Sequence, residues 1–66
     1  MFYIVSLETR QAFNRRRRER AFHSLEAAWW AFSRLIANLD LVEDWSDRFT
    51  ARSDDGTTVA RLRLDD

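Results

Sequence analysis

Residues 24–39 read SLEAAWWAFSRLIANL and form the largest apolar segment of the chain. Wound as a helix, this segment places its large apolar side chains on one stripe, at the i, i+3, i+4 spacing that faces a hydrophobic core: Leu25, Ala28, Trp29, Phe32, Leu35, Ile36 and Leu39. Ser24 is a suitable N-cap, and Glu26 complements the positive end of the helix dipole. We expect the helix to end between Leu39 and Val42, where the apolar stripe gives way to a polar loop.

The segment before this helix predicts a β-hairpin. Residues 1–9 are rich in aromatic and β-branched side chains and begin apolar on both faces, which is typical of a strand inside a sheet. The better core face of this strand is made by Tyr3, Val5 and Leu7. We expect a reversal at Asn14 and Arg15 and a returning strand over residues 16–22. This register pairs Leu7 with Phe22 and Arg10 with Glu19.

The segment after the helix predicts a second hairpin. Asp55 and Gly56 form a strong two-residue turn signal between two alternating segments. A register centred on this turn pairs Ala51 with Ala60 and Phe49 with Leu62, and it places Leu64 on the same face. The opposite face then carries Arg48, Thr50, Arg52, Val59, Arg61 and Arg63.

Together these elements predict one domain over residues 1–66 with an α+β fold. The element order is ββαββ, and we expect a four-stranded antiparallel sheet with one amphipathic helix packed on one face. A chain of 66 residues forms only a thin core, so a partner or a second copy would add stability.

Composition excludes several functional classes. The chain has no Cys and a single His, His23, so we expect neither a disulfide, nor a metal site, nor a cofactor. The sequence holds no Gly-rich phosphate loop, nucleophile elbow or paired-carboxylate pocket, which predicts a protein that is not an enzyme. The formal net charge of zero argues against a general nucleic-acid binder. No apolar run is long enough for a signal peptide or a membrane span, so we expect a soluble cytoplasmic protein without a membrane partner.

Trp30 is the first candidate for a binding residue. At about 100° per residue it points away from the stripe that holds Trp29. Two interpretations stay open for this ring. Either its i+4 neighbour Arg34 partly covers it through a cation–π contact, or the ring anchors a partner protein.

A group of acids at the helix exit is the second candidate. Asp40, Glu43, Asp44 and Asp47 follow the negative end of the helix dipole, where acids are disfavoured. We expect Asp65 and Asp66 nearby, because the last two strands run antiparallel. The acids either neutralise the arginines of the first hairpin or form a negative patch that competes with nucleic-acid phosphates for a basic protein groove.

Arginine supplies an alternative site. The run Arg15, Arg16, Arg17 and Arg18 is suited to phosphate contacts, and the sheet face with Arg48, Arg52, Arg61 and Arg63 could extend it. A sheet that binds RNA normally interleaves stacking aromatics among its basic residues, and we place none on this face.

The layout of a hairpin, one helix and further antiparallel strands, with mixed and patchy charge, resembles the small phage-encoded anti-CRISPR proteins at the level of architecture. The resemblance implies a non-enzymatic inhibitor in the cytoplasm of a bacterial host. Such a protein docks on a CRISPR-Cas effector subunit and blocks target-DNA recognition or nuclease recruitment. The resemblance assigns no residue, and the sequence itself leads us to expect partner binding through Trp30, Arg34 and the four acids, Asp40, Glu43, Asp44 and Asp47.

The alternative hypothesis is a small nucleic-acid-binding accessory protein that uses Arg15, Arg16, Arg17 and Arg18. A homodimer formed through Trp30 or an exposed strand edge is compatible with both hypotheses.

Overall fold

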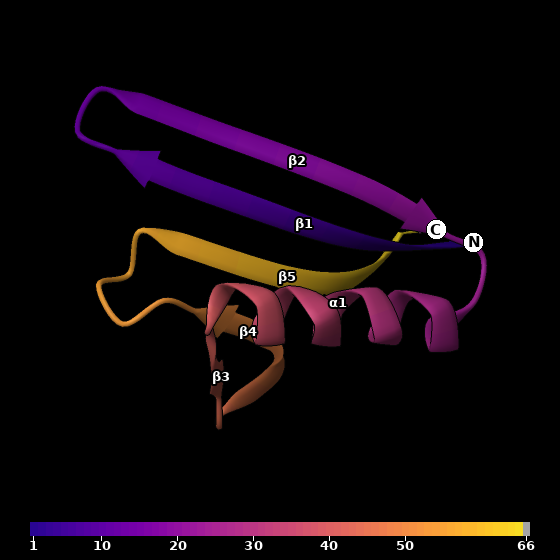
Figure 1. The fold of residues 1–66 in the computed structure, drawn as a ribbon. Helices are drawn as coiled ribbons and strands as arrows, with labels where there is room; N and C mark the ends of the chain where they lie inside the picture. Colours follow the sequence, from indigo (N-terminus) through magenta and orange to yellow (C-terminus); the bar gives the residue numbers. More distant parts are fainter. Residues whose placement is uncertain (66) are drawn as a thin grey trace.

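The computed structural model describes residues 1–65, in which one helix packs against a single antiparallel sheet (Figure 1). The elements are β1 (Phe2–Gln11), β2 (Asn14–Phe22), α1 (Leu25–Leu39), β3 (Val42–Asp44), β4 (Asp47–Arg52) and β5 (Thr58–Asp65). The strand order across the sheet is β2-β1-β5-β4-β3, and every neighbouring pair is antiparallel. The predicted α+β fold is confirmed.

The predicted four-stranded ββαββ sheet is wrong in strand number, because the sheet within residues 1–65 has five strands. The additional strand is β3, which lies in the stretch that we expected to be a loop. It pairs Val42 with Arg52 and Glu43 with Ala51, and the register then shifts at Asp44. The strand is only three residues long, so its pattern is too short to stand out in the sequence.

The helix begins and ends as the sequence predicts. The Ser24 hydroxyl accepts a hydrogen bond from the Ala27 backbone N–H at 3.1 Å. After Leu39 the chain leaves the helix at Asp40, which adopts the left-handed conformation with φ of 54°. The backbone N–H of Leu41 then donates to the Ile36 carbonyl at 2.9 Å, and Leu41 turns into the core.

The core lies between α1 and the middle of the sheet. Only the centre of the predicted stripe is fully buried, since Ala28 and Phe32 have no exposed surface. The end residues Leu25 and Leu39 are 48% and 45% exposed, so the stripe is fully buried only in its middle. From the rest of the chain, the buried core comprises Val5, Leu41, Ala51, Ala60 and Leu62.

The first hairpin turns two residues earlier than predicted. Gln11 pairs with Asn14, so the reversal lies at residues 12–13 and not at Asn14 and Arg15. Leu7 therefore lies opposite Arg18 and Arg10 opposite Arg15, which corrects both predicted pairs. The pairing has shifted by four positions, an even number, so Tyr3, Val5 and Leu7 keep the predicted face toward α1.

The second hairpin has the predicted register and a longer loop. Ala51 pairs with Ala60, as expected, but residues 53–57 form the connection in place of a two-residue turn. Gly56 has φ of 74°, and its N–H donates to the Ser53 carbonyl at 3.0 Å. Within the described residues the ladder ends at Thr50 and Arg61, one pair short of the predicted Phe49–Leu62 pair.

Candidate interaction site

Strand alternation divides the arginine run of β2 between the two faces of the sheet. Arg18 lies opposite Leu7 and Arg20 opposite Val5, so these side chains share the face that α1 covers, and Arg16 lies on the same side. Arg15 and Arg17 lie on the opposite face, which no helix or strand covers and which we call the open face. The predicted site of four consecutive arginines is therefore two sets with different surroundings.

On the open face the arginines are paired with acids. Glu8 forms an ion pair with Arg15 and a longer one, at 3.7 Å, with Arg10. Glu19 pairs with Arg63 of β5 at 2.6 Å and with Arg17 at 3.7 Å. The hydrogen bond from Arg15 lowers the pKa of Glu8, and the hydrogen bond from Arg63 lowers the pKa of Glu19. On this face, therefore, two carboxylates are shared by four arginines.

On the α1 face the arginines form no ion pair within residues 1–65, and two of them, Arg20 and Arg34, lie over aromatic rings. Among the described residues, no carboxylate oxygen lies within 4.0 Å of a side-chain nitrogen of Arg16, Arg18, Arg20 or Arg34. The Arg20 guanidinium lies 5.4 Å from the centre of the Phe22 ring, and the Arg34 guanidinium lies 4.8 Å from the centre of the Trp30 ring. Uncompensated positive charge is therefore concentrated on one side of β2.

A shallow groove runs between β2 and α1 and passes under these side chains. Its central hollow, which shares residues with two others, has a volume of about 440 Å³. A second hollow of about 510 Å³ shares Arg20, Phe22 and Trp30 with it, and a third of about 330 Å³ shares Leu7 and Arg18 with it. We call this surface the β2–α1 groove. The central hollow is lined by Val5, Leu7, Arg18, Glu19, Arg20, Phe22, Trp30, Ala31, Arg34, Leu35 and Asn38.

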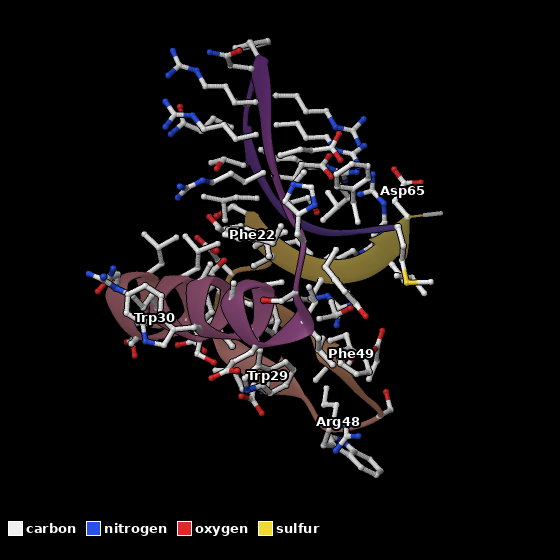
Figure 2. All side chains as sticks on the ribbon, turned by 90° about the vertical axis from the view of Figure 1, so that its right-hand side faces the viewer. Phe22, Trp29, Trp30, Arg48, Phe49 and Asp65 are labelled. Carbon is white, nitrogen blue, oxygen red and sulfur yellow. The ribbon has the colours of Figure 1, made fainter. Side chains whose placement is uncertain are left out.

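Trp30 lies outside the core, as predicted. It also borders this groove. Figure 2 shows Trp29 and Trp30 on different sides of α1, with Trp29 turned toward Phe49. Trp30 is 63% exposed, whereas Trp29 is 36% exposed and contacts the rings of Phe32 and Phe49, each at a centroid distance of 5.8 Å. The cation–π contact with Arg34 is present and leaves the ring exposed, and the anchoring of a partner stays a prediction.

The four acids do not join this groove. Asp44 accepts hydrogen bonds from the Ser46 backbone N–H at 3.0 Å and from Arg52 at 3.0 Å, and its contacts with Ser46 and Arg52 lower its pKa to about 2. Asp47 accepts from the Phe49 N–H at 3.1 Å and from the Thr50 hydroxyl at 2.9 Å. Asp40 ends α1, about 15 Å along the helix from Trp30 at 1.5 Å per residue. Glu43 lies opposite Ala51 in β3.

The described residues show no ion pair that supports the first interpretation of the acidic group, neutralisation of the first hairpin, and the second, a negative patch, stays a prediction. Within residues 1–65 the ion pairs of Arg15 and Arg17 are with Glu8 and Glu19 of their own hairpin, not with the acids at the helix exit. Arg52 compensates the charge of Asp44, whereas Asp40, Glu43 and Asp47 are exposed and form no ion pair among the described residues, so the negative patch stays a prediction. Asp65 pairs with Phe2 of β1, and Asp66 lies outside the described residues. Of the predicted partner-binding residues, the structure brings together Trp30 and Arg34.

Several surface residues were not singled out from the sequence. Arg20 and Phe22 line the β2–α1 groove, and the alternation of β2 is the signal that groups them with Arg16 and Arg18. Two other aromatic side chains are almost fully exposed at hairpin ends, Phe13 at 103% and Trp45 at 96%. Both lie in turns, where hydrophobic periodicity carries no signal.

Comparison with known proteins does not identify this chain. No protein-family model, curated protein or solved structure gave a significant match. Within residues 1–65, no helix combines the length and apolar character needed to cross a membrane. In the same residues no three His, Cys, Asp or Glu side chains are grouped so that they could hold a metal ion. The β2–α1 groove is therefore the candidate functional surface.

Proposed function

We propose that this chain is a non-enzymatic protein-interaction module that docks on its partner through the β2–α1 groove, with Trp30 as the anchor. The observation that carries the proposal is that Trp30 is 63% exposed while it borders two hollows of the groove and is held by Arg34. Tryptophan and arginine are the residues most enriched among interface hot spots, because they bury a large area and keep a polar or charged group available.

The chemistry of the groove suggests the partner surface that would fit it. Val5, Leu7 and Phe22 provide an apolar floor, and Arg18, Arg20 and Arg34 provide a basic rim. An apolar side chain surrounded by carboxylates would bury its hydrocarbon on the floor and pair its acids with the rim. The partner surface that we expect is therefore acidic.

The resemblance in architecture to anti-CRISPR proteins suggests what that partner is. We propose an effector subunit of a bacterial CRISPR-Cas system, bound in the cytoplasm of the host. A basic groove does not mimic DNA, and Asp44, one of the acids that could have done so, is paired with Arg52. Obstruction of nuclease recruitment, a protein–protein contact, is therefore the form of inhibition that we favour over competition with DNA.

The experiment is affinity capture from a bacterial lysate, followed by direct binding measurements with the purified partner. Trp30→Ala should weaken partner binding at least tenfold, because an anchoring side chain at a hot spot is worth about 2 kcal/mol or more. Trp45→Ala is the matched control, since it removes an equally large ring that is 96% exposed at the β3–β4 turn and lies away from the groove. Equal affinities of the Trp30→Ala and wild-type proteins, or recovery of this chain alone, would contradict the proposal.

Nucleic-acid binding is a second candidate, because three arginines without a carboxylate partner in the described chain, Arg18, Arg20 and Arg34, line the same hollow as the exposed Trp30. Base stacking on an aromatic ring next to a basic strand is typical of proteins that bind single strands. A salt series with an oligonucleotide tests it. Three phosphate contacts would give a log–log slope of about −2, and Arg18→Gln should reduce that slope while Arg17→Gln, on the open face, should change it less. Absence of binding at low salt would remove this candidate.

A further inference from the structure

The two edges of the sheet differ in how open they are to another strand. The β3 edge is three residues long, and its register shifts between Glu43 and Asp44. The β2 edge is nine residues long, and its register with β1 is regular from Tyr3↔Phe22 to Gln11↔Asn14. Short, irregular edges resist the addition of a strand, whereas long regular edges accept one. Figure 1 shows β2 at the outer side of the sheet, away from β5 and β4.

The register identifies the backbone groups that this edge presents. The Arg10 N–H donates to the Thr57 carbonyl at 2.8 Å, so even-numbered residues of β1 face β5 and odd-numbered residues face β2. In an antiparallel ladder the residues opposite those odd positions bond back to β1, and these are the even-numbered residues of β2. The N–H and C=O groups of Arg15, Arg17, Glu19 and Ala21 therefore point outward from the sheet.

The side chains of this edge disfavour pairing with a second copy of β2 and favour an acidic strand. A second copy of β2 paired along the same edge would bring the arginines of two strands together, and like charges on facing strands are destabilising. A strand with acidic side chains at alternate positions would instead lie beside Arg16, Arg18 and Arg20, which have no carboxylate partner in the described chain. The same side of that strand would face the β2–α1 groove and Arg34.

We propose that β2 accepts an extended, acidic segment of the partner protein as an added antiparallel strand, with alternate carboxylates directed toward Arg16, Arg18 and Arg20. This inference rests on the proposed function, because it states which part of the partner enters the docking surface. Backbone hydrogen bonds to residues 15–21 supply the pairing, and the row of arginines selects the acidic sequence. The segment's remaining side chains project from the other side of the extended sheet, the side of the open face.

A synthetic peptide tests the proposal directly. The probe is a ten-residue peptide of alternating Glu and Thr with blocked termini, and binding is followed by fluorescence anisotropy and by backbone amide hydrogen exchange. We expect exchange of the Arg15, Arg17, Glu19 and Ala21 amides to slow at least tenfold on binding. The even-numbered amides of β2 should change much less, because they already bond to β1.

Two N-methylated peptides separate strand pairing from simple charge attraction. With Glu opposite Arg16, Arg18 and Arg20, the Thr residues present their backbone groups to β2. Methylation of the Thr nitrogens should abolish binding, whereas methylation of the Glu nitrogens should preserve it, although both peptides carry the same charge. Equal binding of both methylated peptides would overturn the proposal, and so would failure of the unmodified peptide to bind.

A pair of substitutions makes the same test on this chain. Arg17→Pro removes an outward N–H and leaves the bonds from β2 to β1 in place, since proline is tolerated on edge strands. Arg17→Ala loses the same charge and keeps that N–H. We expect Arg17→Ala to bind the peptide within threefold of wild type and Arg17→Pro to bind at least tenfold more weakly. If Arg17→Pro does not fold, as judged by circular dichroism, the methylated peptides still decide the question.

The captured partner distinguishes the two proposals. A partner that loses affinity for Trp30→Ala but binds Arg17→Pro as it binds Arg17→Ala would overturn strand addition and leave the proposed function standing. A partner that binds both Trp30→Ala and Arg17→Pro like wild type would contradict the proposed function itself. Two further results would overturn strand addition: outward amides already protected in the free protein, which indicates pairing of two copies, or oligonucleotide binding that outcompetes the peptide.

Discussion

Glu19 of β2 and Arg63 of β5 form an ion pair across the strand between them, with a carboxylate oxygen 2.6 Å from a guanidinium nitrogen. Within the ladder, Glu19 lies opposite Ser6 of β1, and Arg63 lies opposite Ile4. Ser6 and Ile4 are 6% and 9% exposed although they lie on the open face. Only neighbouring side chains can exclude water there, and long arginine side chains do so with their methylene groups. The pair therefore links three strands and compensates charge on the open face.

Replacement of Glu19 tests that role. Hydrogen bonding to Arg63 lowers the pKa of Glu19 in the folded protein below its ordinary value of 4.5. The ionised carboxylate therefore stabilises the fold above pH 4.5, and this contribution is lost as the pH falls through the lowered value. We expect Glu19→Gln to unfold at lower urea concentration than wild type at pH 7, and the difference to disappear in strong acid. Arg63→Gln should make the Glu19→Gln substitution nearly silent at pH 7, and independent effects of the two substitutions would contradict the pairing.

Phe32 and Trp29 should differ sharply in their importance for folding. Phe32 is the one large side chain in residues 1–65 with no exposed surface, so Phe32→Ala should cost about 3–5 kcal/mol. A domain of this size has a total stability of only about 3–10 kcal/mol, so this variant should be largely unfolded or close to it. Trp29→Ala should cost about 1–3 kcal/mol, because it loses contacts with two rings that are worth about 0.5–1.5 kcal/mol each. Urea unfolding measures both values, and equal costs would show that Trp29 belongs to the core.

The sequence carried enough information for the helix, the faces of the strands and the register of the second hairpin. Ser24 and the i, i+3, i+4 stripe determine where α1 begins and which side it buries. A slip of one residue in the second hairpin would mix apolar and basic side chains, so only one local register separates them. The side-chain pattern of the first hairpin does not determine its register in this way. A shift of four positions leaves every side chain on its own face, and alternation alone does not distinguish the two registers.

The candidate site was predictable only in part, for a related reason. The outward direction of Trp30 and its contact with Arg34 follow from helix geometry, so the sequence predicts both. The roles of Asp44 and Asp47 depend on turns that hydrophobic patterns do not reveal, and free and hydrogen-bonded carboxylates look alike in a sequence. The division of the arginine run needed only the alternation of β2. Which of its two sets has acidic partners depended on the register of the first hairpin, which places Glu8 on the same face as Arg15 and Arg17.

Gly56 is required for the backbone of the second hairpin loop and not for lack of space. Its φ is 74°, and a Cβ built at this position would meet no atom within 4 Å. Gly56→Ala should therefore cost about 1 kcal/mol from backbone strain alone, which corresponds to a fall of about 4–8 °C in melting temperature for a domain of this size. Gly56→Asn should cost less, because asparagine tolerates the left-handed region. A thermal scan that ranks the two variants in the opposite order would contradict this explanation.

Asp55 should make the same loop sensitive to acid. One of its carboxylate oxygens accepts hydrogen bonds from the Ser53 hydroxyl at 2.7 Å, the Thr57 N–H at 3.0 Å and the Thr57 hydroxyl at 2.8 Å. Led by the bond from Ser53, these contacts lower the pKa of Asp55 from 3.8 to about 2. The charged form therefore stabilises the loop above pH 3.8, and the contribution is lost between pH 3.8 and about pH 2.

Asp55→Asn isolates the charge, because asparagine keeps an oxygen that accepts hydrogen bonds. It should be less stable than wild type at pH 7 and should approach wild type at pH 2. Asp54→Asn is the matched control, since the neighbouring Asp54 side chain accepts no hydrogen bond from the described residues. An NMR titration of the two carboxylates alongside the unfolding curves completes the test. A normal pKa for Asp55, or an Asp54→Asn effect of equal size and pH dependence, would show that the loop is not held by this carboxylate.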